Sequence, residues 1–172
     1  MVFRSRRFWL PFALAAAFAS SPAFAAREVV ASPYPYPAGT IVISKSQRKL
    51  YLQLGDGEAM RYPVAVGMPG KAWLGWTSVV GKYVEPAWSP PAEVKRDHPS
   101  LPNYIPGGSS HNPMGLRAMT LGRSEIAIHG TTISMRKSVG TAASYGCIRM
   151  YNEDIVDLFN RVNVGTPVVA VP

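Results

Sequence analysis

The sequence predicts a single, mainly β domain with one helix near its C-terminal end. The 172 residues are enough for one domain that buries its own core. Apolar residues recur at every second position at Ile41 and Ile43 and again at Leu50, Leu52 and Leu54, which is the period of a half-buried strand. A helical spacing of apolar residues follows Asn152, over residues 152–162. We expect residues 39–171 to form the domain.

Residues 1–25 have the pattern of a secretory signal peptide. Three arginines precede the apolar run 8–18, and Ala23-Phe24-Ala25 has the form of a cleavage site. We therefore expect an exported protein that acts in the periplasm or the cell envelope. The alternative is an uncleaved membrane anchor. That needs about 20 apolar residues, whereas this run is shorter and Pro11 and Pro22 interrupt the segment.

The charge balance bears on possible partners. The formal net charge is +8. Without the signal peptide it falls to +5, because 15 of the 18 basic residues remain and the number of acidic residues stays at 10. A basic exported protein can bind nucleic acid, anionic lipid or an acidic polymer. No helix, finger or aromatic platform of a nucleic-acid motif is visible. We expect no nucleic acid partner and favour an anionic cell-wall polymer.

Residues 26–38 are expected to be a proline-rich linker. Proline alternates with tyrosine in residues 33–37, and such a run favours extended polyproline geometry. The segment is interpreted as a linker or an N-terminal strap. A proline-rich ligand for a binding domain is the alternative.

The period-two pattern predicts a β-hairpin over residues 40–54, with residues 45–48 between its strands. The turn Gly55-Asp56-Gly57 leads to a third strand over residues 59–66, where Pro63 implies an edge or a bulge. Residues 79–84 are expected to form another strand.

Residues 86–108 are rich in proline and show little periodicity. A connection of this length in a compact domain is expected to have a function, so we interpret it as a lid or wall beside an active site. Strands are predicted at residues 116–121 and 125–129, which places His129 at a strand end. Residues 131–144 are expected to form a loop.

The predicted helix begins with Asn152 as its cap, followed by acidic residues in the first turn. Four apolar side chains are expected on one face: Ile155, Leu158, Phe159 and Val162. A final apolar strand over residues 166–171 closes the chain.

The candidate chemistry centres on Cys147, the only cysteine. A lone cysteine forms no internal disulfide, and in an exported chain it suggests a reactive thiol or an intermolecular pair. Cysteine attacks as a thiolate, which requires a nearby base or positive charge. His129, eighteen positions upstream, is the candidate base. The alternatives are a small buried cysteine and a core histidine.

The pattern His129-Gly130-Thr131 followed by Ser144-Tyr145-Gly146-Cys147-Ile148-Arg149-Met150 resembles the signature of the L,D-transpeptidase (YkuD-type) catalytic domain. The resemblance covers roughly residues 39–171 and implies a β-sandwich-like domain. It implies a cysteinyl acyl-enzyme that cross-links peptidoglycan stem peptides, or attaches a protein amine such as that of a wall-anchored lipoprotein, and that carbapenems inhibit. The alternatives are an L,D-carboxypeptidase or endopeptidase that hydrolyses the same bonds, and a non-catalytic wall-binding module.

The resemblance also implies roles for individual residues. The backbone carbonyl of Gly130 is expected to orient His129, and Arg149 to bind the anionic stem peptide. The alternative for Arg149 is a structural cation that holds the loop. Ser144 matches the motif, or simply caps the loop, while Tyr145 stands where many relatives have histidine.

Four further interpretations concern the site. Gly146 permits close backbone approach, and the N–H groups of residues 145–147 are candidate oxyanion donors. His111 is expected to line the cleft. His98, His111, His129 and Cys147 lack any closely spaced ligand pair, so we expect no metal and no other cofactor. Trp73, Trp76, Trp88 and Tyr83 are interpreted as packing residues or as a substrate-contacting wall.

Overall fold

The computed structural model describes residues 27–172, so the predicted signal peptide lies outside the described residues. The strands are β1 (Glu28–Ala31), β2 (Ile41–Ser44), β3 (Lys49–Gly55), β4 (Glu58–Pro63), β5 (Val66–Gly67), β6 (Gly75–Val84), β7 (Arg117–Leu121), β8 (Ala127–His129), β9 (Ala142–Ser144), β10 (Ile148–Arg149) and β11 (Pro167–Val171). The helices are α1 (Ala92–Asp97) and α2 (Asn152–Arg161), with a 3₁₀ turn at Arg136–Ser138. The mainly β prediction is confirmed.

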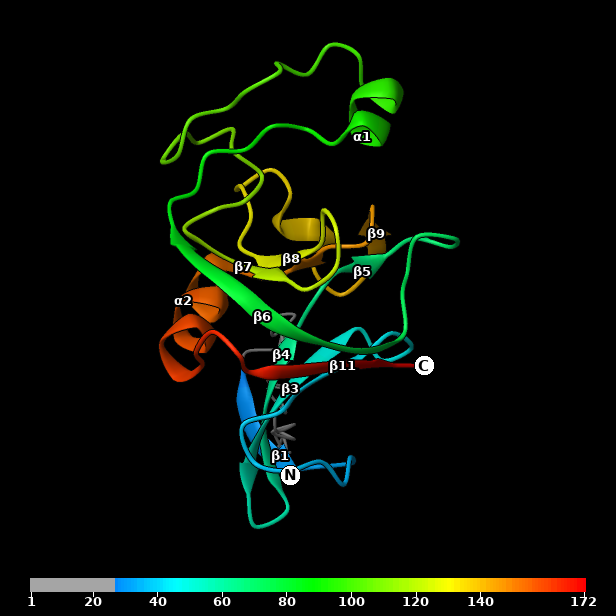
Figure 1. The fold of residues 1–172 in the computed structure, drawn as a ribbon, viewed down its shortest axis with the longest axis vertical. Coiled ribbons are helices and arrows are strands. Elements are labelled where there is room, and N and C mark those ends of the chain that lie inside the picture. Colours follow the sequence, from blue (N-terminus) through cyan, green and yellow to red (C-terminus); the bar gives the residue numbers. More distant parts are fainter. Residues whose placement is uncertain (1–26) are drawn as a thin grey trace, which may run out of the picture.

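Nine strands form one bent sheet in the order β1-β4-β3-β2-β11-β6-β7-β8-β10, and β5 pairs separately with β9 (Figure 1). Strand β6 joins the two halves. Its residues Gly75 to Ser78 pair with β11 and its residues from Val79 onward pair with β7, and a register shift between Val79 and Gly81 interrupts the pairing with β7. A bulge of this kind bends a strand and increases its twist. The two halves consequently face each other across one core.

The predicted hairpin is confirmed as β2 and β3, which pair antiparallel with Ile41 opposite Leu52 and Ile43 opposite Leu50. These four side chains belong to the main core, together with Met119, Ile128 and Ile148 from the other half. Burial of such side chains provides about 1.5–3 kcal/mol each. The alternation of apolar residues in the sequence therefore marks the face of the sheet that packs inward.

The second face of β2 and β3 is also covered. Val42, Tyr51 and Val169 form a smaller apolar cluster on which Tyr34 and Tyr36 pack. The Tyr34 ring meets the Tyr51 ring edge to face at 5.4 Å between centroids. Residues 32–37 are thus a strap across the sheet.

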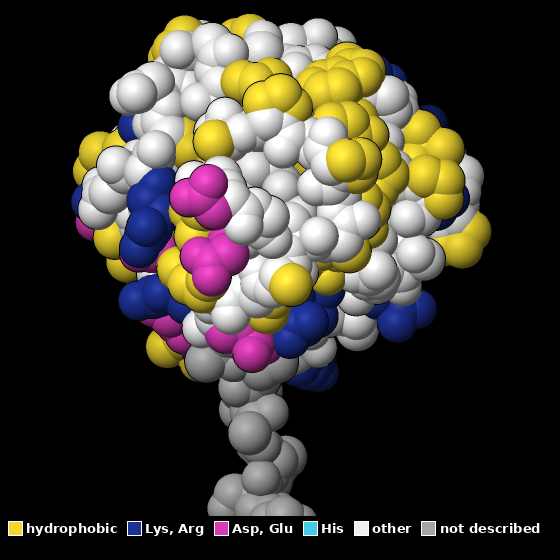
Figure 2. Space-filling view, turned by 90° about the horizontal axis from the view of Figure 1, so that it is seen from below, with side chains coloured by type: hydrophobic (Ala, Val, Ile, Leu, Met, Phe, Trp, Pro, Cys, Tyr) yellow, Lys and Arg dark blue, Asp and Glu magenta, His cyan; other side chains and the backbone are white. Residues whose placement is uncertain are grey.

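At the end of the molecule seen in Figure 2, hydrophobic side chains gather beside charges of both signs.

Strand β1 lies inside the segment that was expected to be a linker. Residues Glu28–Ala31 pair antiparallel with β4, from Glu28 opposite Arg61 to Ala31 opposite Glu58. The strand is four residues long and largely exposed, so its sequence shows no alternation of apolar and polar residues that would predict a strand. Pairing with the exposed edge of β4 is what makes it a strand.

Besides the predicted helix near the C-terminal end, the proline-rich segment contains a second helix, α1. Pro91 precedes this helix, Glu93 lies in its first turn, and Lys95 and Arg96 lie in its last turn. These positions suit the helix dipole. The helix has six residues and buries none of them, so no apolar repeat indicates it.

Helix α2 confirms the predicted apolar face, since Ile155, Leu158 and Val162 are almost completely buried and Phe159 packs beside them. The predicted cap was wrong. The N-cap residue is Tyr151, and Asn152 is the first residue of the helix.

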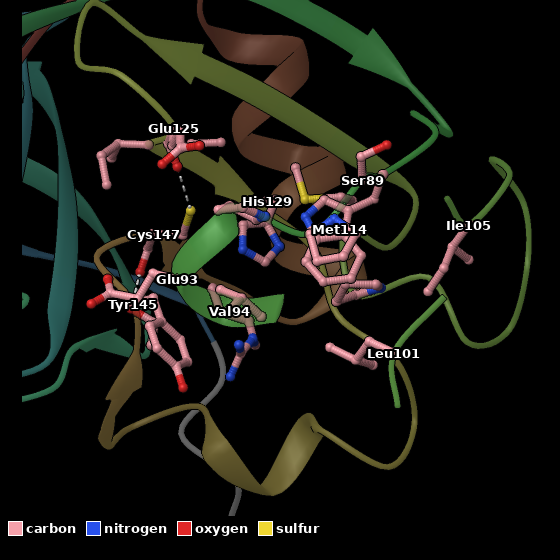
Figure 3. Close-up of a pocket in the computed structure, with 18 of the residues that line it drawn as sticks. Ser89, Glu93, Val94, Leu101, Ile105, Met114, Glu125, His129, Tyr145 and Cys147 are labelled. Carbon is pink, nitrogen blue, oxygen red and sulfur yellow. Dashed lines mark hydrogen bonds between the residues drawn. The ribbon is translucent and has the colours of Figure 1, made fainter. Parts of the chain in front are cut away.

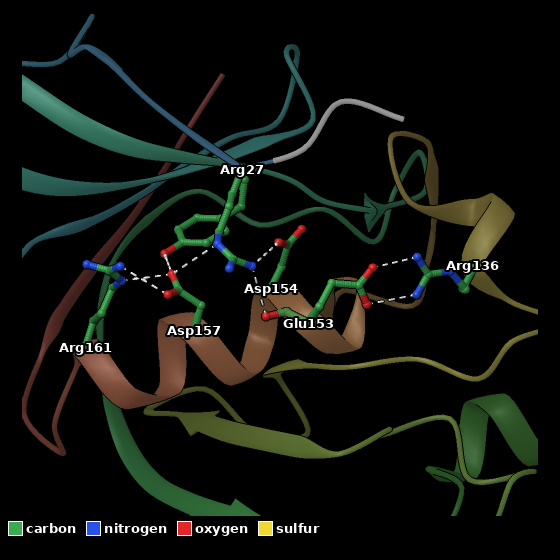
Figure 4. A network of polar contacts seen from close by, with 7 residues as sticks. Arg27, Arg136, Glu153, Asp154, Asp157 and Arg161 are labelled. Atoms are coloured by element: carbon green, nitrogen blue, oxygen red, sulfur yellow. Dashed lines mark hydrogen bonds and ion pairs between the residues drawn. The ribbon is translucent and has the colours of Figure 1, made fainter. Parts of the chain in front are cut away.

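The acidic residues of α2 anchor neighbouring segments (Figure 4). Arg27 lies 3.3 Å from buried Asp154, which ties the N-terminal end of the described chain to the helix. Glu153 pairs with Arg136 at 2.6 Å, and Asp157 pairs with Arg161 and accepts a 2.6 Å hydrogen bond from Tyr62. None of the helices in the described part of the chain is long and apolar enough to cross a membrane.

Candidate active site

A cavity of about 980 Å³ lies between the proline-rich segment and the strand ends that carry His129 and Cys147. Figure 3 shows His129 and Cys147 facing the same space, with Val94 and Leu101 of the proline-rich segment on its other side. Trp88, His98, His111 and Ile105 also line the cavity. The interpretation of this segment as a wall of the site is thus consistent with its position.

Cys147 directly precedes β10, at the end of a tight loop. Gly146 has φ of +120°, and a Cβ there would lie 2.7 Å from Ile126 Cδ1, so glycine is required at this position. Ser144 Oγ donates to the Cys147 carbonyl at 2.5 Å and accepts the Gly146 N–H at 3.1 Å. Trp73 Nε1 donates to the Gly146 carbonyl at 3.0 Å. Ser144 and Trp73 thereby fix the loop that carries the thiol.

His129 is the last residue of β8, which pairs in parallel with β10 so that His129 lies opposite Arg149. Its Nδ1 lies 2.8 Å from the Gly130 carbonyl oxygen and donates its proton there. This bond leaves Nε2 of the neutral ring as the basic nitrogen. The Gly130 carbonyl oxygen therefore lies where it can orient the His129 ring, which is the role that the resemblance implied for it.

Cys147 and His129 share the cavity, but no hydrogen bond joins them in the described structure. The thiol of Cys147 instead donates to the Glu125 carbonyl oxygen at 3.5 Å (Figure 3). Glu125 has φ of +59°, a left-handed conformation that is uncommon for residues other than glycine. The turn between β7 and β8 thus contributes a backbone acceptor to the nucleophile.

Asn152 connects helix α2 to the loop that follows His129. Its Oδ1 accepts the N–H groups of Thr131 at 3.0 Å and Leu116 at 3.3 Å, and its Nδ2 donates to the Thr131 carbonyl at 2.9 Å. A Cβ on Gly130 would lie 2.2 Å from the same Oδ1. The side chain that was predicted to cap the helix therefore positions the backbone beside the candidate base.

Burial keeps both candidate catalytic groups neutral. Burial raises the pKa of the Cys147 thiol, while the Ala127 N–H and the Arg149 charge act in the opposite direction. Burial and, to a lesser extent, the Arg149 charge lower the pKa of His129 to about 4, although hydrogen bonds to backbone carbonyls partly oppose this. At neutral pH the resting pair is a thiol and an uncharged imidazole, which is able to accept a proton.

We expect the pH dependence of Cys147 alkylation to reflect this neutral pair. Because the thiol pKa is raised, the rate with iodoacetamide should still increase above the ordinary thiol value of about 8.5. Because His129 remains neutral down to about pH 4, no step should appear near pH 6.5. An unstructured peptide of residues 144–150 is the control and should titrate at the ordinary value. A rate plateau between pH 5 and 8 would indicate a preformed thiolate–imidazolium pair and contradict this expectation.

Arg149 is a buried cation that lacks a carboxylate partner among the described residues. Its side chain lines the cavity, the residue is 8% exposed, and Nη1 donates to Ser138 Oγ at 2.8 Å. Its Nε is buried and has no hydrogen-bond partner in the described structure. An isolated buried charge is costly, so a site for an anionic ligand accounts for this arrangement.

Tyr145 lies against the proline-rich segment. Its hydroxyl donates to Asp97 at 2.9 Å and lies 3.3 Å from His98 Nε2, while Lys71 forms an ion pair with Glu93 of α1. These contacts hold α1 beside the nucleophile loop. Trp76 and Tyr83 are about half exposed, and neither lines the cavity.

Among the oxyanion donors that the sequence suggested, the Gly146 N–H is already bonded to Ser144 Oγ. The Cys147 N–H has no hydrogen-bond partner in the described part of the chain. It is therefore a better candidate than the Gly146 N–H. His98 and His111 line the cavity, and the described residues contain no group of three or more His, Cys, Asp or Glu arranged to hold a metal.

Three residues that contribute to the site were not predicted from the sequence: Asn152, Ser138 and Glu125. Asn152 was assigned to a helix cap, because asparagine before an apolar helical repeat is the usual sign of one. Ser138 contacts Arg149, and the Glu125 carbonyl contacts Cys147. Both contacts join segments that are distant in the sequence, so no local sequence pattern indicates them.

Three comparisons relate this chain to known proteins. The family model of the L,D-transpeptidase catalytic domain matches residues 38–169. The probable L,D-transpeptidase YbiS of Escherichia coli (strain K12) is 37% identical over 136 residues, which are 76% of this chain and 43% of that protein. The chain thus spans less than half the length of this curated relative.

The solved structures agree in fold. The structure of LD transpeptidase LdtMt1 in complex with imipenem has a TM-score of 0.56 at 22% identity and covers 77% of this chain and 58% of its own. A crystal structure from Brucella melitensis, described as a probable carnitine operon oxidoreductase, is 38% identical with a TM-score of 0.56. It covers 88% of this chain and 96% of its own. That name differs from the name of the family whose model matches most of this chain.

Proposed function

Since this chain belongs to the L,D-transpeptidase catalytic domain family, we propose that it transfers an acyl group between peptidoglycan stem peptides through a thioester on Cys147. The observation that supports this most strongly is the meeting of three groups in one cavity: Cys147, the neutral base His129 and the unpaired cation Arg149. The donor that the family resemblance implies is a stem tetrapeptide that ends in D-Ala. Its carboxylate is the anion that we assign to Arg149.

The proposed acylation uses each of these groups in turn. Neutral His129 accepts the thiol proton as the sulfur attacks the amide carbonyl next to D-Ala, and the Cys147 N–H stabilises the oxyanion. The C–N bond then breaks, and the imidazolium returns its proton to the departing amine. D-Ala leaves, and the remaining tripeptide is held as a thioester.

The fate of the thioester defines the alternatives. Attack by an amine of a second stem gives a cross-link, and attack by an amine of a wall-anchored lipoprotein would attach that protein. Attack by water gives L,D-carboxypeptidase or endopeptidase activity. The basic, apolar and small-residue order of residues 1–25 supports export by a signal peptide, and we place the reaction in the periplasm or cell envelope.

We expect the mature protein, incubated with disaccharide-tetrapeptides, to release D-Ala and to form cross-linked dimers detected by mass spectrometry. A Cys147→Ala protein should form neither product, because the acyl-enzyme cannot form. D-Ala release with tripeptide but no dimer would favour the hydrolase. If the parent released no D-Ala yet sedimented with peptidoglycan as well as Cys147→Ala does, the protein would be a wall-binding module instead.

A further inference from the structure

We propose that Glu125 binds the ammonium group of the acceptor amine and thereby favours acyl transfer over hydrolysis. The inference rests on the proposed function, since it concerns the second half of that reaction. The acceptor is defined only by its chemistry, a primary amine that is protonated at neutral pH.

The position of Glu125 is fixed with respect to the nucleophile. Its carbonyl oxygen accepts the Cys147 thiol at 3.5 Å, and its left-handed backbone conformation sets the direction of the side chain. The residue lines the cavity, and its negative charge adds a small contribution to the raised pKa of the Cys147 thiol, which is due mainly to burial. Figure 3 shows Glu125 beside Cys147 and on the opposite side of the sulfur from Tyr145.

Of the two carboxylates that line the cavity, only Glu125 lacks a partner among residues 27–172. Glu93, the other carboxylate that lines the cavity, pairs with Lys71 and Arg96. The Glu125 carboxylate has no ion pair or hydrogen bond with any residue that the structure describes. Nearby Arg123 lies over the Trp73 ring, 4.9 Å from its centroid. Glu125 is therefore available to a cationic ligand.

Two unpaired charges of opposite sign consequently lie on the cavity wall near one sulfur. Arg149 is buried and suits the carboxylate of the donor, whereas Glu125 is exposed and suits an ammonium that arrives after D-Ala has left. In the transfer step the amine nitrogen forms the new C–N bond and the thioester C–S bond breaks. Of the two protons that the ammonium loses, one returns to the sulfur and one passes to water.

The test compares the parent with Glu125→Gln, which keeps the side-chain size and removes the charge. Mass spectrometry measures the ratio of dimer to hydrolysed tripeptide at increasing acceptor concentration. We expect the ratio to fall about 1.5- to fivefold in Glu125→Gln, the range for losing one solvent-exposed charge pair. The KM for acceptor should rise by a similar factor, Glu125→Asp should recover part of the loss, and the difference should shrink in high salt.

Glu58→Gln, a carboxylate at the start of β4 and remote from the cavity, is the matched charge control and should keep the parent ratio. An unchanged ratio in Glu125→Gln, or an equal fall in Glu58→Gln, would overturn the inference. A difference that does not respond to salt or to acceptor concentration would also overturn it, since the effect would then not be one of charge recognition. A parent that releases no D-Ala would refute the proposed function itself.

Discussion

Replacing His129 by glutamine should slow carbapenem acylation of Cys147 by about two to four orders of magnitude, the usual scale for losing a general base. The imidazole is neutral at pH 7, so it is ready to take the proton of a thiol whose own pKa burial has raised. Glutamine retains a donor for the Gly130 carbonyl but has no basic nitrogen. The loss should therefore be one of proton transfer rather than of folding.

Intact-mass spectrometry at several carbapenem concentrations measures this rate, and digestion should locate the adduct on the peptide that contains Cys147. Cys147→Ser should give no thioester adduct. His98→Gln, which changes another histidine of the cavity wall, should remain within about tenfold of the parent. Equal rates in His129→Gln and the parent would mean that Cys147 is merely an accessible thiol.

Replacing Asn152 by alanine should lower the free energy of unfolding by about 2–4 kcal/mol and also reduce acylation. The change leaves the Thr131 N–H, the Leu116 N–H and the Thr131 carbonyl without their partner. Each buried group left unsatisfied costs about 1–3 kcal/mol, although water is expected to reach some of them. The loop that carries the Gly130 carbonyl would then be free to shift, so His129 would lose its fixed orientation.

Thermal unfolding followed by circular dichroism checks the stability change, and we expect the Tm to fall by roughly 5–15 °C. Asn160→Ala is the matched control on the same helix, because the Asn160 side chain is exposed and forms no hydrogen bond with any residue that the structure describes. It should change the unfolding free energy by less than about 0.5 kcal/mol. If Asn152→Ala were as stable as Asn160→Ala, the three contacts would contribute no net stability.

Local patterns predicted most of the strands because the sheet buries alternate residues. Ile41, Ile43, Leu50 and Leu52 face the main core, and this explains why the period-two pattern identified the hairpin. Helix α2 was found for the same reason, through its apolar face. The patterns failed for β1 and α1, since neither element buries enough side chains to leave a periodic signal.

The sequence by itself determined the chemistry that the site contains. Cys147, Gly146 and His129 have residue types and a spacing that point to a thiol nucleophile with a base, and Gly146 is needed where the loop passes Ile126. Cysteine and histidine have these chemical capacities in any fold, so their presence is visible in the sequence alone.

Only the tertiary structure decided how those residues are held and charged. The parallel pairing of β8 with β10 places His129 opposite Arg149, and burial in that arrangement sets the pKa directions of the thiol and the imidazole. The turn before β8 brings the Glu125 carbonyl to the sulfur, and Asn152 reaches the His129 loop from a helix more than twenty residues later. Contacts between distant segments, desolvation and unpaired charge depend on the packed chain, and no local sequence pattern encodes them.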